Sequence, residues 1–229
     1  MYNLIARIKN KLKGKLFLIG EQKEILGKLN LSGIQFNTYL PHSGSSLKYS
    51  TLSCVLNDVI INNRRSIVEF GSGISTIYLA KLNNLKIEIS SIDDNEVWIG
   101  IMKDILQKED VVEYVNFIHS PLIKSNLAIN NNVWYDTDII KKQIKDKLFD
   151  VVIIDGPMAY TKEKALSRYP ALPFIVPYLF PEHLIVLDDT NRKGEKRIIQ
   201  KWESSHQYTF QKLNSSSHIS FKGSHLNIT

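Results

Sequence analysis

Residues 67–80 read IVEFGSGISTIYLA, and this stretch decides the fold. An apolar run containing Glu69 meets two glycines, Gly71 and Gly73, and an apolar helical pattern follows at once. Glycine accepts backbone angles that other residues avoid, so a tight turn explains the pair. A cofactor loop explains it equally, because glycine lets the backbone approach a ligand and the first amides of a helix are unpaired. The rest of the sequence has to decide between these interpretations.

The composition is that of a globular protein with one main domain. The chain has 229 residues, 43% of them hydrophobic and 23% charged, which is enough for a sizeable core. The single cysteine, Cys54, excludes an internal disulfide framework and suits a reducing compartment, so a cytoplasmic location is predicted. Its apolar neighbours repeat at helical spacing, so we expect it to be buried. No apolar run reaches the roughly 20 residues that a membrane-spanning helix needs.

The net charge of +6 belongs almost entirely to the N-terminal segment. Residues 1–28 contain seven basic and two acidic residues, which leaves a charge of only +1 for the domain over 29–229. Apolar residues of this segment fall on one helical face: Leu4, Ile5, Ile8, Leu12, Leu16 and Ile19. Such a basic amphipathic helix would lie on an anionic inner membrane surface as a peripheral contact. The alternative is that it packs on its own domain with a solvated basic face.

Strands and helices alternate along the remaining chain. The apolar spacing predicts a helix from residue 50 to about 62, and further helices over 75–82, 95–108, 137–148 and 192–205. A long, proline-punctuated helical region is expected before residue 183. Near-continuous apolar strands are expected over 66–70, 86–92, 115–119, 149–155 and 183–189. The closing strands, 208–213 and 218–223, have no helix between them and should form an antiparallel hairpin. The sequence therefore predicts an α/β fold: a doubly wound, mostly parallel seven-stranded sheet with helices on both faces and a C-terminal antiparallel hairpin.

Polar or acidic residues end nearly every predicted parallel strand. In an open sheet of this kind, ligands bind beyond the carboxyl ends of the strands, near the point where the strand order reverses. A single acid at such a place commonly caps the next helix, but several converging on one edge favour a ligand site. The candidates are Glu69 with the 71–73 loop, Asp93 and Asp94, His119 and Ser120, Asp155, and Asp188 and Asp189.

The motif EFGSGIST, residues 69–76, resembles the first motif of class I S-adenosylmethionine-dependent methyltransferases, in a pattern similar to bacterial O-methyltransferases. The resemblance covers residues 50–229 and implies a Rossmann-like fold with S-adenosylmethionine as cofactor. It implies that Asp93, or Asp94 in its place, holds the ribose hydroxyls, that Glu69 orients the methionyl amino group, and that Ser120 lies near the adenine. The complete set of cofactor-binding residues expected from it is Glu69, Gly71, Ser72, Gly73, Ser75, Thr76, Asp93, Asp94, Ser120 and Asp155.

A nicotinamide or flavin site is the main competitor for this glycine loop. Its fingerprint is G-x-G-x-x-G, and here Thr76 stands where the third glycine would be. The sequence therefore favours the methyltransferase interpretation over a nicotinamide-dependent enzyme.

Three carboxylates at neighbouring strand ends raise the question of a metal. Asp155, Asp188 and Asp189 would repel one another unless they bind a cation, share a proton or hold acceptor hydroxyls, and oxygen ligands suit Mg²⁺ or another divalent cation. The arrangement resembles metal-dependent O-methyltransferases of the catechol type, with Asp155 as metal ligand or catalytic base. It departs from them in having Asp-Asp for Asp-Asn and Met158 in place of the family's lysine base. The alternative is a local Asp189–Arg192 ion pair, with Asp188 capping the next helix.

The acceptor is expected to be a small molecule or a glycan. The stretches IDGP, RYPALP and LDDTNRKGE look like bacterial methyltransferases that modify polysaccharides or small metabolites, with Tyr160, Arg168 and Arg192 in the acceptor pocket. Nucleic acid is not favoured as a partner, because DGPM at residues 155–158 does not match the motif that stacks a flipped base. A non-catalytic S-adenosylmethionine-binding domain is a further alternative. The sequence leaves the oligomeric state open.

Overall fold

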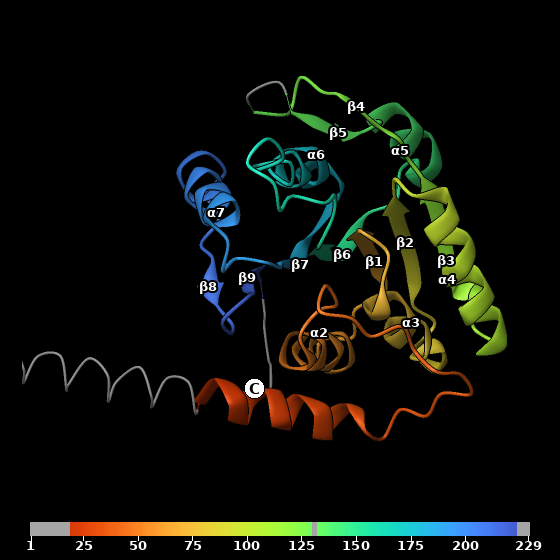
Figure 1. The fold of residues 1–229 in the computed structure, drawn as a ribbon. Helices are drawn as coiled ribbons and strands as arrows, with labels where there is room; N and C mark the ends of the chain where they lie inside the picture. The colour runs from red at the N-terminus through yellow and green to blue at the C-terminus, as the bar shows by residue number, and fades with distance from the viewer. Residues whose placement is uncertain (1–18, 130–131, 224–229) are drawn as a thin grey trace, which may run out of the picture.

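The computed structural model describes residues 19–129 and 132–223, and its centre is a seven-stranded sheet (Figure 1). The strand order is β3-β2-β1-β6-β7-β9-β8, and the order reverses between β1 and β6. The first five strands of this order run parallel, and β9 and β8 close the sheet as an antiparallel hairpin. The strands are β1 (Ser66–Phe70), β2 (Glu88–Asp93), β3 (Val115–His119), β6 (Phe149–Ile154), β7 (Leu179–Leu187), β8 (Gln211–Lys212) and β9 (His218–Lys222). The predicted fold class is confirmed.

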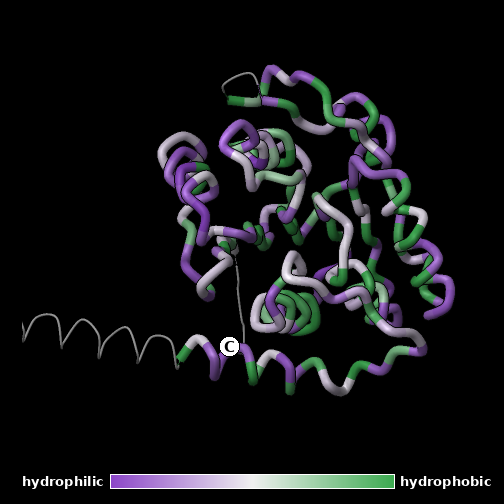
Figure 2. Tube along the Cα trace, viewed as in Figure 1, coloured by the Kyte–Doolittle hydropathy of each residue, from purple (hydrophilic) through white to green (hydrophobic). Residues whose placement is uncertain are grey.

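Helices cover both faces of the sheet. The apolar residues of α2 (Tyr49–Ile61), α3 (Ile74–Ala80) and α4 (Glu96–Lys108) pack on one face, and those of α5 (Thr137–Ile144), α6 (Ala171–Ile175) and α7 (Lys193–Ser205) pack on the other. Successive strand residues serve opposite faces, as Ile67 and Val68 of β1 do. Both faces are therefore buried, and Figure 2 shows hydrophobic positions within the central strands. Short 3₁₀ turns connect the elements at η1 (Asn83–Leu85), η2 (Val112–Tyr114) and η3 (Val176–Tyr178).

The structure differs from the sequence-based expectation in four places. The first strand of the closing hairpin, predicted over 208–213, is only Gln211–Lys212. A small antiparallel hairpin, β4 (Leu122–Lys124) with β5 (Val133–Tyr135), was not predicted, because its strands have only three residues each. Helix α5 ends four residues early, at Ile144, because the next residue, Lys145, has a positive φ of 52° and leaves the helical region. The proline-punctuated stretch before β7 forms only the five-residue α6 and η3, and β7 itself starts four residues early.

Residues 19–31 form a helix that lies along α2 (Figure 1). A Cβ on Gly27 would come within 2.6 Å of the main chain at Tyr49 and Ser50, so only glycine permits this contact. The Glu24 carboxylate accepts hydrogen bonds from the amides of Tyr49 (2.8 Å) and Ser50 (3.1 Å) and so caps α2 from outside it. Most of the predicted basic segment, residues 1–18, lies outside the described residues. Among those described, no helix combines the length and the apolarity that crossing a membrane requires.

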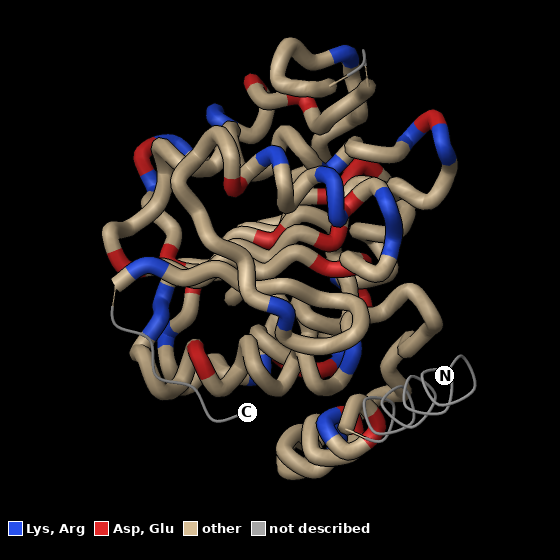
Figure 3. The backbone as a smooth tube through the Cα atoms, turned by 90° about the vertical axis from the view of Figure 1, so that its left-hand side faces the viewer, with Lys and Arg blue, Asp and Glu red and all other residues tan. Residues whose placement is uncertain are grey.

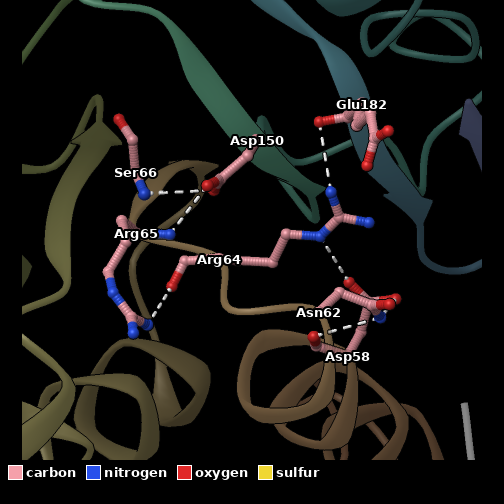
Figure 4. Close-up of polar contacts among 7 residues, drawn as sticks. All are labelled: Asp58, Asn62, Arg64, Arg65, Ser66, Asp150 and Glu182. Atoms are coloured by element: carbon pink, nitrogen blue, oxygen red, sulfur yellow. Dashed lines mark hydrogen bonds and ion pairs between the residues drawn. The ribbon is translucent and has the colours of Figure 1, made fainter. Parts of the chain in front are cut away.

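The amino ends of the strands are held by buried ionic contacts (Figure 4). Arg64 donates from Nε to the Asp58 carboxylate (3.0 Å) and from Nη1 to the Glu182 carbonyl (3.1 Å), joining α2 to β7. The Asp150 carboxylate accepts from the amides of residues 65–66, at 2.7 and 3.0 Å, and joins β6 to β1. These contacts join α2, β1, β6 and β7, so they stabilise the fold at this edge of the sheet.

Candidate functional site

A cavity of about 330 Å³ opens at the carboxyl ends of the strands, beside the reversal of strand order. Segments far apart in the chain line it: residues within 41–47, 71–75, 93–98 and 155–160, together with Tyr135, Arg168, Asp189 and Arg192. This is the place at which an open α/β sheet binds its ligands.

The two glycines of the loop after β1 have different reasons to be glycine. Gly71 has a φ of +94°, and a Cβ there would come within 2.8 Å of the Gly156 amide nitrogen. Gly73 has extended backbone angles that any residue adopts, and a Cβ there would meet no atom within 4 Å. Gly71 is therefore required by the fold, whereas Gly73 leaves space at the cavity wall.

Glu69 lies behind the loop and is fully buried. Its carboxylate accepts hydrogen bonds from the hydroxyls of Ser75 and Thr76, and from Ser91 Oγ at 3.1 Å. Burial raises the pKa of Glu69 to about 7, and these hydrogen bonds oppose the rise. Neither Glu69 nor Thr76 lines the cavity. In this arrangement Glu69 holds the first turn of α3 through these hydroxyls, and its contact with the cofactor's amino group stays a prediction.

The acid after β2 is locked to the same loop. Asp93 accepts hydrogen bonds from the amides of Ser72 (2.8 Å) and Asn95 (2.9 Å), and Trp98 Nε1 donates to the Ser72 carbonyl at 2.9 Å. Burial raises the pKa of Asp93 despite these hydrogen bonds. Asp93, the exposed Asp94 and Trp98 all line the cavity. The residues expected to hold the cofactor's ribose thus form one wall with the glycine loop.

Ser120 does not take the place that was expected of it. It is buried, its hydroxyl donates to the Asp136 carbonyl at 3.1 Å, and it is not among the cavity-lining residues. Its position at the end of β3 is as predicted, but its side chain is used to hold the turn before α5.

The same cavity is also lined by the predicted acceptor residues. Asp155 follows β6 and is held by its amide, which donates to the Phe70 carbonyl at 2.9 Å. Its Oδ1 lies 3.3 Å from Nη2 of the buried Arg168, and burial raises the pKa of Asp155 well above its usual range while Arg168 opposes the rise. Tyr160 and Arg192 also line the cavity, so all three predicted acceptor-pocket residues line the same cavity as Asp155.

The three predicted metal ligands come together, but not around an open position. Oxygen atoms of Asp155, Asp188 and Asp189 lie within 4.8 Å of one another. Asp188 is buried and accepts a hydrogen bond from Ser217 Oγ at 2.5 Å, and Asp189 Oδ2 lies 3.0 Å from Arg168 Nη2. Because the guanidinium contacts two of the three carboxylates, the cluster does not fit a divalent cation in this arrangement.

The alternative interpretation of these acids had two parts, an ion pair of Asp189 with Arg192 and a helix cap by Asp188, and only the ion pair is correct. Arg192 Nη1 lies 2.8 Å from Asp189 Oδ2, so the expected ion pair forms. Asp188 does not cap the following helix, because the residue before α7 is Arg192 and no side chain accepts a hydrogen bond there.

Sequence reasoning missed two parts of the cavity. The segment 41–47 contributes Ser43, Ser45 and Ser46, and β5 contributes Tyr135. The only sequence signal of the first is a loop rich in serine, glycine and proline, which marks a loop without placing it. Tyr135 lies on a hairpin too short to be recognised.

No family model matches this chain, and no curated protein matches it either. Solved structures match it over most of its length. The SAH-bound methyltransferase PaMTH1 of Podospora anserina has a TM-score of 0.62 at 11% identity, covering 93% of this chain and 96% of its own. The O-methyltransferase TomG of Streptomyces achromogenes, in complex with SAM, has a TM-score of 0.57 at 12% identity, covering 88% of this chain and 90% of its own. The Bacillus cereus O-methyltransferase in complex with SAH has a TM-score of 0.55 at 15% identity, covering 88% of this chain and 91% of its own. The chain has the fold of the class I S-adenosylmethionine-dependent methyltransferases.

Proposed function

We propose that this protein is an S-adenosylmethionine-dependent methyltransferase that methylates a hydroxyl of a small molecule or sugar. The observation that carries the proposal is that the glycine loop, Asp93, Asp155 and Arg168 all line one cavity. The solved structures of the same fold that hold SAM or SAH support it.

The donor half of the cavity fits S-adenosylmethionine. Gly73 leaves open the space that a Cβ would fill, and Trp98 fixes the loop through the Ser72 carbonyl. The remaining lone pairs of Asp93 are available to ribose hydroxyls at the same wall. When bound, the cofactor supplies a methyl group on a positively charged sulfur.

Asp155 is the group placed to act as base. It lines the cavity, its side chain is 20% exposed, and its raised pKa makes it a better proton acceptor than an ordinary aspartate. As the acceptor oxygen takes the methyl group, its O–H bond breaks and the proton passes to Asp155. Methyl transfer is an in-line displacement, so the other residues mainly hold the acceptor in line.

The acceptor wall suits a hydroxylated molecule. Segment 41–47 brings three serines to the cavity, and Tyr160 and Arg192 add a phenol and a guanidinium. Four acids, in contrast, line the cavity: Asp93, Asp94, Asp155 and Asp189. Figure 3 shows acidic and basic positions interspersed over the described chain, without a continuous basic face on this side. A polyanion such as nucleic acid is therefore not favoured.

Cofactor binding is tested by isothermal titration of the full chain with S-adenosylhomocysteine, with NAD as the control ligand. We expect binding of the former alone, and a loss of at least about tenfold in affinity in Asp93→Ala, which is about 1.4 kcal/mol. Asp104→Ala, which removes an exposed acid of α4, is the matched control and should bind as the wild type does. A folded protein that binds no S-adenosylhomocysteine would overturn the proposal.

Catalysis is tested by following S-adenosylhomocysteine formation with a panel of sugars and phenols. Asp155→Asn should still bind S-adenosylhomocysteine but lose activity by about 10²-fold or more, as removal of a general base does. A chain that binds the cofactor but forms no product with any acceptor would support the non-catalytic alternative.

A further inference from the structure

Arg168 is a buried cation at the cavity, and each nitrogen of its guanidinium group contacts an oxygen of the chain. It is 3% exposed and comes from the irregular segment between β6 and α6. Its Nε donates to the Pro157 carbonyl at 3.2 Å and its Nη1 donates to the Asp188 carbonyl at 3.3 Å. Its Nη2 lies 3.3 Å from the Asp155 carboxylate and 3.0 Å from the Asp189 carboxylate. All three guanidinium nitrogens therefore have partners, and their direction is fixed.

This fixed cation lies where a divalent ion would have to bind. A metal ion held by Asp155 and Asp189 would need their oxygens at about 2.0–2.6 Å, and would meet the guanidinium that already contacts both. The third carboxylate, Asp188, is occupied by Ser217 and does not line the cavity. Asp189 is further held by Arg192 at 2.8 Å. The positive charge that balances Asp155 and Asp189 thus comes from arginines of the chain itself.

We infer that Arg168 takes the place of the divalent cation, so that methyl transfer at this site needs no metal. The claim that methyl transfer needs no metal rests on the proposed function. The claim that Arg168 takes the place of the cation does not, because it concerns only the contacts within this chain. An arginine stays charged at every physiological pH and presents its donors in a rigid plane. It can therefore stabilise negative charge on an acceptor oxygen and on Asp155 as the proton moves between them.

Mn²⁺ binding tests the structural part without any activity. The full chain is freed of metals with a chelator and titrated with Mn²⁺, and the free ion is followed by electron paramagnetic resonance. We expect the wild type to have no Mn²⁺ site that depends on Asp189. Its Mn²⁺ binding should therefore be the same with and without the substitution Asp189→Asn. Arg168→Met should gain a Mn²⁺ site, and Asp189→Asn in that background should abolish it. Arg197→Met, on the exposed face of α7, is the matched control and should gain none.

The inference would be overturned if the wild type bound one Mn²⁺ and if Asp189→Asn lost that binding. This outcome holds whether or not Arg168→Met folds. The catalytic part is tested by S-adenosylhomocysteine formation after chelation: we expect less than a twofold change, and a loss of activity restored by Mg²⁺ would contradict it. Titration with S-adenosylhomocysteine on the same samples separates the two ideas. Absence of that binding would end the proposed function, while the Mn²⁺ result would still decide the role of Arg168.

Discussion

Gly71 and Gly73 belong to one motif, yet different physical constraints act on them. Gly71 closes the turn after β1 in a conformation that a side chain rarely adopts, packed against Gly156. Gly73 is unconstrained by its own backbone and by its neighbours, and the open space at its Cα faces the cavity, where a ligand can use it. This difference makes the two positions separable by experiment.

Gly71→Ala should destabilise the fold, and Gly73→Ala should leave the fold intact and weaken cofactor binding. We expect the free energy of unfolding to fall by about 1–3 kcal/mol for Gly71→Ala, because of its positive φ and its contact with Gly156. For Gly73→Ala it should change by less than about 1 kcal/mol, while affinity for S-adenosylhomocysteine falls about tenfold or more. Urea unfolding and isothermal titration measure the two quantities.

Gly100→Ala is the control for this pair, since Gly100 lies in α4, does not line the cavity, and has no atom within 4 Å of the position that a Cβ would take. It should bind S-adenosylhomocysteine as the wild type does. Unchanged binding in Gly73→Ala would show that the open space is not used by the cofactor.

The sequence predicted the residues at strand ends better than their contacts. Asp93, Asp155 and Asp189 all line the cavity, because a parallel sheet brings the ends of its strands to one edge. Glu69 and Ser120 sit at strand ends too, but their hydrogen-bond partners turn them away from it. The partners of Glu69 lie on α3 and β2, and that of Ser120 lies just before α5; the apolar periodicity that predicts these elements does not encode such polar contacts.

Among the elements, the helices and long strands were predictable and the irregular segments were not. Apolar spacing placed α4 and β6 to within a residue or two. The β4–β5 hairpin and the 41–47 segment were missed, since three-residue strands and serine-rich loops carry no repeating pattern. The acceptor side of the cavity depends on these missed parts.

Glu109, at the end of α4, holds the segment that leads to the 41–47 loop. It is 2% exposed, and its carboxylate accepts from the amides of Asn37 (3.0 Å) and Thr38 (2.7 Å) and from Lys81 Nζ (2.9 Å). Burial alone would raise the pKa of Glu109, but these hydrogen bonds outweigh it and bring the pKa to about 2. The ionised carboxylate therefore anchors one wall of the cavity.

Glu109→Gln should lower the free energy of unfolding at pH 7 by about 1–3 kcal/mol. A folded pKa below the unfolded one means that this contribution is present above pH 4.5 and is lost as the pH falls toward 2. The difference between wild type and variant should therefore shrink by about 2 kcal/mol between pH 7 and pH 3. Urea unfolding at both values measures it, with the exposed Glu113→Gln as control; a difference independent of pH would contradict the assignment.

For the molecule as a whole, one sheet edge is closed by ionic contacts and the other collects polar groups around a cavity. The amino edge is joined by Arg64 and Asp150, whose partners lie on α2, β1 and β7. At the carboxyl edge, Glu69 sits in the central strand β1, and within the described chain its carboxylate is held by three hydroxyls rather than by a cation. Ionising Glu69 therefore weakens the whole fold rather than one loop.

The pH dependence of global stability should reveal this group. The pKa of Glu69 is about 7 in the folded protein, above its ordinary value of 4.5, so its stabilising contribution is complete below pH 4.5 and is lost as the pH rises through 7. Glu69→Gln keeps a neutral side chain at every pH. Its free energy of unfolding, relative to the wild type without cofactor, should therefore rise by about 2–3 kcal/mol between pH 5 and pH 8. Urea unfolding at both values measures the rise, and Glu96→Gln, on the exposed start of α4, should show none. Parallel pH profiles for Glu69→Gln and the wild type would mean that the carboxyl is already ionised in the fold, stabilised by the three hydroxyls alone.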